Sequence, residues 1–181
     1  IPVNEGSLHQ QYVMNVLTGA WCRFTGYNCN CFAVFNGELY MGGNGTVSKC
    51  WSTFGDNGIA ILGIAETAFD YFKSRTKKSF KMLRPIISSN GSPSISAGLD
   101  IDYSDADRVS TVTFNTVSGA LWGIALWGIG LWGSGLQTLR NWIGVSEIGL
   151  CAATRLHVNA QGIEVRWQAV DYIYEVGEGV V

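Results

Sequence analysis

Apolar and polar residues alternate along much of the chain, and frequent turns separate the alternating stretches. In residues 95–103, small or polar residues alternate with Ile95, Ala97, Leu99, Ile101 and Tyr103. This pattern predicts a half-buried strand with one solvated face. Residues 109–117 are rich in Val and Thr, as strands are, and residues 151–158 and 163–174 predict a hairpin around 159–162. Together these segments predict an antiparallel β-sandwich of about six strands.

The N-terminal part predicts shorter strands joined by tight turns. Residues 32–35 and 38–41 flank Asn36-Gly37, the strongest short-range hairpin signal. Four or five such strands fit one propeller-like blade or a β-meander. A single blade cannot bury its own faces, so we expect neighbouring blades from preceding chain. The polar loop at 52–58 predicts a boundary, with the blade or meander in 1–54 and the sandwich in 55–181.

Two segments are less regular. Residues 59–72 fit both an apolar helical face and strand alternation, and we interpret them as a strand because strands surround them. Residues 80–88 predict a strand that contains Pro85. Because proline donates no ladder hydrogen bond, this strand is expected at a sheet edge or next to a bulge.

An uncharged repeat stands between Arg108 and Arg140. The sequences A-L-W-G-I, A-L-W-G-I and G-L-W-G-S place Trp122, Trp127 and Trp132 five residues apart. Residues 117–136 are long enough for a membrane span, but six glycines weaken a helix there and no basic flank is close. We expect an extended or turn-rich segment that packs its tryptophans on a sheet or a neighbouring subunit. Contact with a membrane is the alternative.

The same repeat contains a literal G-x-G-x-x-G at residues 128–133. A dinucleotide-binding fingerprint requires a preceding strand, a following helix and a βαβ unit. None of these is evident, and the repeat already accounts for the glycines. We therefore interpret the motif as a chance match and predict no cofactor.

Charge gives little support for nucleic-acid binding. Twelve Lys and Arg against fourteen Asp and Glu give a net charge of −2. Half of the basic residues lie in residues 73–84, close to aromatic residues. They form either a phosphate-binding patch or, as we favour, a solvated hairpin tip that keeps an edge soluble. The candidate basic contacts are Lys73, Arg75, Lys77 and Lys78.

An acidic run follows at Asp100, Asp102, Asp105 and Asp107. It lacks the glycine and the final glutamate of a calcium-binding EF-hand loop. We expect solvated carboxylates, with Asp100 and Asp102 on the outer face of a strand. Pairing between this run and the basic residues of another subunit is a further possibility, and nothing in the run distinguishes a catalytic acid from a base.

Composition and motifs narrow the function classes further. With 47% hydrophobic and 14% charged residues, the chain is neither a disordered tail nor a coiled coil. Five cysteines without zinc spacing predict free thiols in a reducing compartment and no metal. No nucleophile, metalloprotease or phosphate-loop motif occurs, so we predict no catalytic residue. The start at Ile1, with neither Met nor a signal-like run, suggests a processed product or a piece of a longer protein.

Several runs of sequence resemble one family. Residues 11–26 (QYVMNVLTGAWCRFTG) and 35–47 (FNGELYMGGNGTV) resemble the C-terminal part of tail nozzle proteins of short-tailed bacteriophages, also called packaged-DNA stabilisation proteins. The segments 71–75, 80–85, the Trp repeat and 162–167 (GIEVRW) continue the resemblance in the same order. It covers nearly all of the chain. The repeat departs from the family, which often has more polar residues between the tryptophans.

The resemblance implies a virion structural protein of the tail, assembled in the host cytoplasm and without catalytic residues. Such proteins form a ring, commonly a hexamer, below the portal and adaptor. They close the channel on packaged double-stranded DNA and conduct it at ejection without binding it specifically. Two other classes stay open: a carbohydrate- or receptor-binding β module that exposes Trp122, Trp127 or Trp132, and a propeller hydrolase with acidic residues at a channel mouth.

Overall fold

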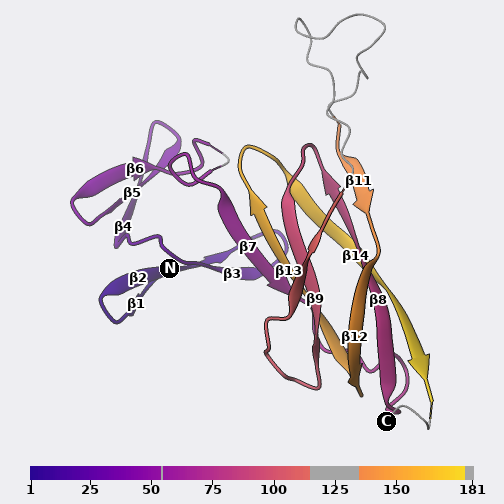
Figure 1. Ribbon diagram of the computed structural model, residues 1–181. Coiled ribbons are helices and arrows are strands. Elements are labelled where there is room, and N and C mark those ends of the chain that lie inside the picture. Colours follow the sequence, from indigo (N-terminus) through magenta and orange to yellow (C-terminus); the bar gives the residue numbers. More distant parts are fainter. Residues whose placement is uncertain (54, 115–134, 178–181) are drawn as a thin grey trace, which may run out of the picture. The chain divides into compact units, whose positions relative to one another are not determined.

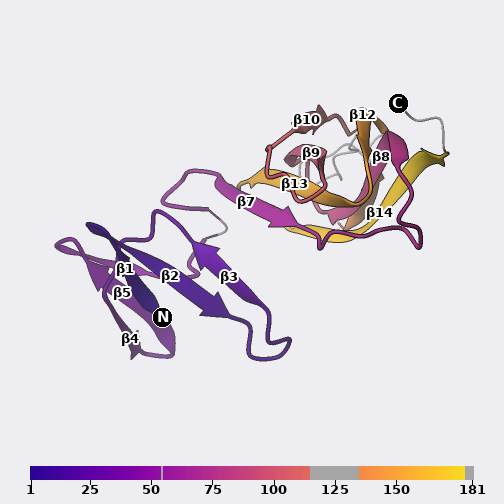
Figure 2. The ribbon, with the colours of Figure 1, turned by 90° about the horizontal axis from the view of Figure 1, so that it is seen from below.

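The computed structural model describes residues 1–53, 55–114 and 135–177, and these residues form strands and no helix. The predicted all-β class is therefore confirmed. The chain divides into two compact units, Ile1–Thr53 (unit 1) and Phe54–Val181 (unit 2). This division falls one residue before the boundary predicted from the sequence. Figures 1 and 2 together label the strands of both units.

Unit 1 contains two three-stranded antiparallel meanders. The first has the order β1-β2-β3 and the second the order β4-β5-β6, where the strands are β1 (Pro2–Glu5), β2 (Leu8–Met14), β3 (Trp21–Phe24), β4 (Cys31–Phe35), β5 (Glu38–Gly43) and β6 (Thr46–Lys49). Six strands in two sheets replace the four or five expected in one blade. The sequence did not predict β1, because its four residues (PVNE) show no apolar alternation.

The Asn36-Gly37 hairpin is confirmed. Both residues have positive φ angles, 51° and 78°, as a two-residue turn of this type requires. The flanking residues Phe35 and Glu38 are paired. Asn44 and Gly45 make an equivalent turn between β5 and β6, with φ angles of 53° and 73°.

Unit 2 is a sandwich of two antiparallel sheets. The first sheet has the order β10-β9-β13-β7; in the second, β14 runs along one side of β8, and β11 and β12 follow each other along its other side. The strands are β7 (Ile61–Glu66), β8 (Lys78–Ser89), β9 (Ser94–Ile101), β10 (Val109–Val112), β11 (Gln137–Arg140), β12 (Ile143–Gly149), β13 (Ala152–Ala160) and β14 (Val165–Val176). Figures 1 and 2 both show β9 and β13 on one side and β8 and β14 on the other.

The core of unit 2 lies between these two sheets. Apolar side chains from β8 (Phe80, Leu83, Ile87), β9 (Ile95, Ala97, Leu99, Ile101), β10 (Val112) and β13 (Ala152, Leu156) are buried together. The inward positions predicted at Ile95, Ala97, Leu99 and Ile101 are thus confirmed, but the solvated opposite face is wrong, because Gly98 and Asp100 are buried as well. The strand ends at Ile101, since Asp102 and Tyr103 adopt positive φ angles of 51° and 62° and form a turn.

The hairpin predicted at 151–174 is wrong. β13 pairs with β9 and β7, whereas β14 pairs with β8 in the other sheet. At the crossing, the Glu164 amide donates a 2.8 Å hydrogen bond to Asn90 Oδ1, beside the end of β8. From there β14 pairs along the whole of β8, from Val165 opposite Ser89 to Val176 opposite Lys78. This long pairing outweighs a local hairpin.

Of the two positions expected for the Pro85 strand, the sheet edge is wrong, because β8 has partners on both sides, whereas the nearby bulge is found. Pro85 is nevertheless accommodated without a ladder donor. On one side the register of β12 reaches Leu83 and that of β11 begins at Ile86, so Pro85 lies where the partner strand changes. On the other side Pro85 pairs with Val170, and the register of β14 shifts nearby at a bulge between Trp167 and Ala169.

Candidate functional site

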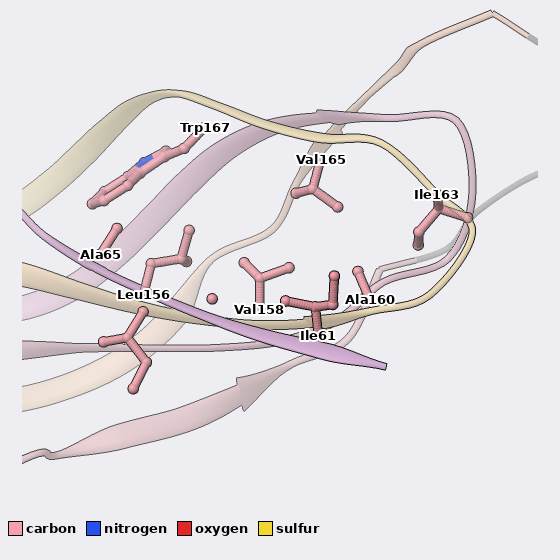
Figure 3. A pocket seen from close by; sticks show the side chains of 10 residues that line it. Ile61, Ala65, Leu156, Val158, Ala160, Ile163, Val165 and Trp167 are labelled. Carbon is pink, nitrogen blue, oxygen red and sulfur yellow. The ribbon is translucent and has the colours of Figure 1, made fainter. Parts of the chain in front are cut away.

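An apolar groove opens between β7 and β13 on one side and the start of β14 on the other. It has a volume of about 390 Å³, and every side chain that lines it is apolar. The principal ones are Ile61, Ala65, Val158, Ala160, Val165 and Trp167. Figure 3 shows side chains of β7 and β13 facing those of the β14 segment across this space. We call this feature the groove.

The groove exists because the sandwich is not filled at this edge. The positions of β7 that face inward are Ile61, Gly63 and Ala65, paired with Ala160, Val158 and Leu156 of β13. Glycine has no side chain and alanine only a methyl group. The space that larger residues would occupy between the sheets is therefore left open.

β7 is also an unprotected edge strand. Within the described part of the chain it pairs with β13 alone, and Leu62 and Ile64 on its other face are each 60% exposed. It contains no proline, and its one charge is Glu66 at the end. Natural edge strands usually carry charges, prolines or bulges that prevent pairing with other chains. The edge of β7 and the groove together form one apolar surface.

Unit 1 exposes much apolar surface as well. Its buried hydrophobic residues, among those described, are Cys29 and Cys50, and its centre is held by the buried Gln11 amide, which donates to the Tyr27 and Cys29 carbonyls. Twelve large hydrophobic residues are exposed: Ile1, Val3, Leu8, Met14, Val16, Leu17, Trp21, Phe32, Val34, Phe35, Val47 and Trp51. This composition is typical of a surface that partners cover.

The candidate basic contacts do not form one exposed patch. Lys78 is fully buried, and its ammonium donates to the carbonyls of Ser74, Thr76 (2.9 Å) and Leu150 (3.0 Å). The Arg75 guanidinium lies 5.5 Å from the ring centre of Tyr71. Residues 74–77 link β7 to β8, which belong to different sheets, so the expected hairpin tip is wrong.

The other candidate basic residues vary in exposure. Lys73 and Lys77 are exposed. Further along β8, Lys81 pairs with Glu175 at 3.5 Å. Arg84 Nε donates to Asp171 at 2.9 Å, and the Arg84 guanidinium also lies 4.5 Å from the ring centre of Trp142. Several side chains of the basic cluster thus form hydrogen bonds, ion pairs or ring contacts within unit 2.

The acidic run is organised around Arg155 of β13. Asp100 is 1% exposed, with Oδ2 2.8 Å from Arg155 Nε, so the solvated position expected for it is wrong. The same guanidinium bonds Asp105 and Glu66, the latter at 2.9 Å, and lies 3.6 Å from Asp107. The hydrogen bond to Asp105 and these carboxylates raise the pKa of Arg155.

Asp100 is buried because residues 102–108 fold over the outer face of β9. At Gly98 the backbone of this segment comes so close that a Cβ atom would overlap the Arg108 carbonyl oxygen. Asp107 also contacts His157 Nε2 at 3.1 Å. The acidic run therefore fastens this segment to β13, and within the described residues no group of three or more His, Cys, Asp or Glu is placed to hold a metal ion.

All five thiols are free. Cys22 and Cys31 are exposed, and Cys29, Cys50 and Cys151 are buried. Burial raises the pKa of Cys29 and of Cys151. The Tyr27 hydroxyl donates to Cys50 Sγ at 3.2 Å.

The candidate tryptophan contacts Trp122, Trp127 and Trp132 lie outside the described residues, in the segment between β10 and β11. None of the described residues lies in a helix with the length and hydrophobicity needed to cross a bilayer. Comparison of the chain with protein-family models, curated proteins and solved structures finds no match.

Proposed function

We propose that this chain is a non-enzymatic structural component of the short tail of a bacteriophage virion, part of the nozzle. In this role copies of the chain form a ring next to the portal and adaptor, retain packaged DNA and conduct it at ejection. The sequence runs at residues 11–26 and 35–47, and the segments that follow them in order, support the family.

The exposed apolar surface is the observation that carries this proposal. Unit 1 leaves twelve large hydrophobic residues exposed, and unit 2 adds the groove and the edge of β7. A lone soluble protein rarely exposes so much apolar surface. Subunits of permanent assemblies do, because their interfaces are large and resemble a divided protein core.

The charge distribution suits a conduit. Each phosphate that a protein neutralises adds salt-dependent affinity for DNA, so a channel wall that grips the duplex would slow its passage. The net charge is −2, and the cations Lys78, Arg84 and Arg155 are bonded within unit 2. Lys49, Lys81, Arg108 and Arg166 are paired with carboxylates as well. Seven of the twelve basic side chains are thus engaged within the chain, which reduces the positive charge that could hold the phosphate backbone.

The assembly state tests the proposal. We would measure the mass of the 181-residue chain by multi-angle light scattering and image the same sample by negative-stain electron microscopy. The expected result is closed rings whose mass is a whole multiple of 19.7 kDa.

A carbohydrate- or receptor-binding β module is the alternative from the sequence. In that case the chain would be a monomer, and a soluble glycan would quench the fluorescence of exposed tryptophans. A monomer that binds glycans in this way would contradict the nozzle proposal. Buffer with a sugar that the protein does not bind is the control for non-specific quenching.

A further inference from the structure

The Trp repeat and the groove belong to opposite edges of the sandwich. In the first sheet β10 and β7 are the two outer strands, and the groove is lined by β7. In the second sheet β11 and β14 lie on opposite sides of β8, and the groove is lined by the start of β14. The twenty residues 115–134 connect β10 to β11. The described residues that flank this segment, Phe114 and Gly135, therefore lie at the edge away from the groove.

We propose that the Trp repeat, residues 115–134, of one copy docks in the groove of a second copy. This inference rests on the proposed function, since it supplies the contact between adjacent ring subunits. Because the two surfaces differ, the contact is head-to-tail. Repetition of a head-to-tail contact closes a ring when its rotation fits a whole number of copies.

The chemistry of the two surfaces matches. The groove is lined by apolar side chains, Trp167 among them, and the repeat has no charge between Arg108 and Arg140. Docking therefore buries no unpaired charge, which would be costly. Three indoles provide the large buried areas that dominate interface energetics. The groove volume of about 390 Å³ is in the range of roughly 300–1,000 Å³ in which proteins enclose bound groups.

Docking within the same copy is less favourable. The repeat would have to pass over the end of the sandwich, from β10 past β9 and β13 to β7, a distance of about 14 Å at the usual strand spacing. The turns at that end contain polar residues, including Asn90, Ser92, Gln161 and Glu164. An apolar segment lying over them would remove polar groups from water without replacing their hydrogen bonds.

The inference can be tested with two variants, each of which lacks one half of the proposed contact. Ile61→Asp places a charge in the groove at a side chain that is already half exposed. The triple substitution Trp122→Ser, Trp127→Ser and Trp132→Ser removes the indoles of the repeat. The matched control is Ile173→Asp, the same substitution at an exposed residue of β14 that does not line the groove.

We expect each of the two variants to be a monomer by light scattering. Their equimolar mixture should form a heterodimer, a twofold increase in mass, because one intact groove and one intact repeat remain. The mixture should go no further than the dimer. Ile173→Asp should assemble as the unmodified chain does.

Circular dichroism and cooperative urea unfolding check that each variant is folded. Ala65→Phe, which fills the groove with an apolar ring instead of a charge, replaces Ile61→Asp if the latter unfolds. Folded variants whose mixture stays monomeric overturn the inference, as does a single variant that still assembles fully.

The outcomes separate the two proposals. If the unmodified chain forms rings but the mixture of the two variants stays monomeric, the nozzle proposal stands and the docking proposal is wrong. If the mixture forms heterodimers but the unmodified chain forms open filaments, the docking proposal is supported and the closed ring is contradicted. A monomeric unmodified chain with a monomeric mixture contradicts both.

Discussion

Lys78, the first residue of β8, links this strand to two other stretches of unit 2 through its side chain. Its ammonium donates to carbonyls of the loop before β8, at Ser74 and Thr76, and to Leu150 after β12. Because the site is buried, water does not replace these bonds when the ammonium is lost. The Lys78 side chain therefore holds the loop before β8 in place only when the sandwich is folded.

Lys78→Met should lower the free energy of unfolding by about 2–4 kcal/mol, since it leaves buried carbonyls without their charged donor. Urea denaturation followed by circular dichroism measures this loss. The adjacent Lys77 is exposed, and Lys77→Met is the control, with no measurable change expected. Equal effects of the two substitutions would contradict the role given to Lys78.

The sequence alone could not predict where Lys78 and Asp100 lie. Lys78 stands among other basic residues, and Asp100 occupies an alternation position that predicts the solvent face. Asp100 is buried because residues 102–108 fold back over β9 and Arg155 of the neighbouring strand binds its carboxylate, and Lys78 is buried against the turn at Leu150. Those contacts depend on strand register across the sheet, which local alternation does not contain.

At the scale of elements, local signals succeeded where the strand or turn is determined by its own residues. The Asn36-Gly37 turn and the strand at residues 95–101 are as predicted. Partner choice was harder to predict. Residues 151–174 contain two strands and a turn, but β14 pairs with β8, some eighty residues away in sequence. The groove was missed for the same reason, because Gly63 and Ala65 leave a space only once β14 is opposite them.

β9 and β10 depend on glycine at position 98. A Cβ atom there would overlap the Arg108 carbonyl oxygen, so Gly98→Ala must displace the segment that covers Asp100. We expect a loss of about 3 kcal/mol in unfolding free energy. Gly144 of β12 has open space around its Cβ direction, and Gly144→Ala is the control without loss. Urea unfolding measures both variants, and an unaffected Gly98→Ala protein would show that the close approach does not stabilise the sheet.

At the scale of the whole chain, the two units differ in how much they bury. Among the described residues, thirteen hydrophobic residues are buried in unit 2, against Cys29 and Cys50 in unit 1. Hydrophobic burial is the main favourable term in folding. Unit 1 therefore has less hydrophobic burial to stabilise it than unit 2, and we expect it to be the less stable of the two.

Limited proteolysis should show this difference. In dilute, unassembled protein, a broad-specificity protease should cut within unit 1 first and leave a fragment that begins near residue 54. Mass spectrometry of the products identifies the cuts. In the ring that we propose, contacts with other copies should slow the cleavage of unit 1 at the same protease concentration. Simultaneous degradation of both units at every concentration would contradict the expectation.

The chain passes repeatedly from one sheet of unit 2 to the other. Of the seven connections between successive strands of the described part of unit 2, five change sheet: β7 to β8, β8 to β9, β10 to β11, β12 to β13 and β13 to β14. Neither sheet is therefore complete until nearly all of the unit has been synthesised. Topologies with many long-range pairings cross their folding barrier slowly, in milliseconds to seconds for small domains. The uncovered edge of β7 and the apolar residues beside it are thus accessible throughout this interval, and newly made chains have to avoid premature association before the sandwich closes.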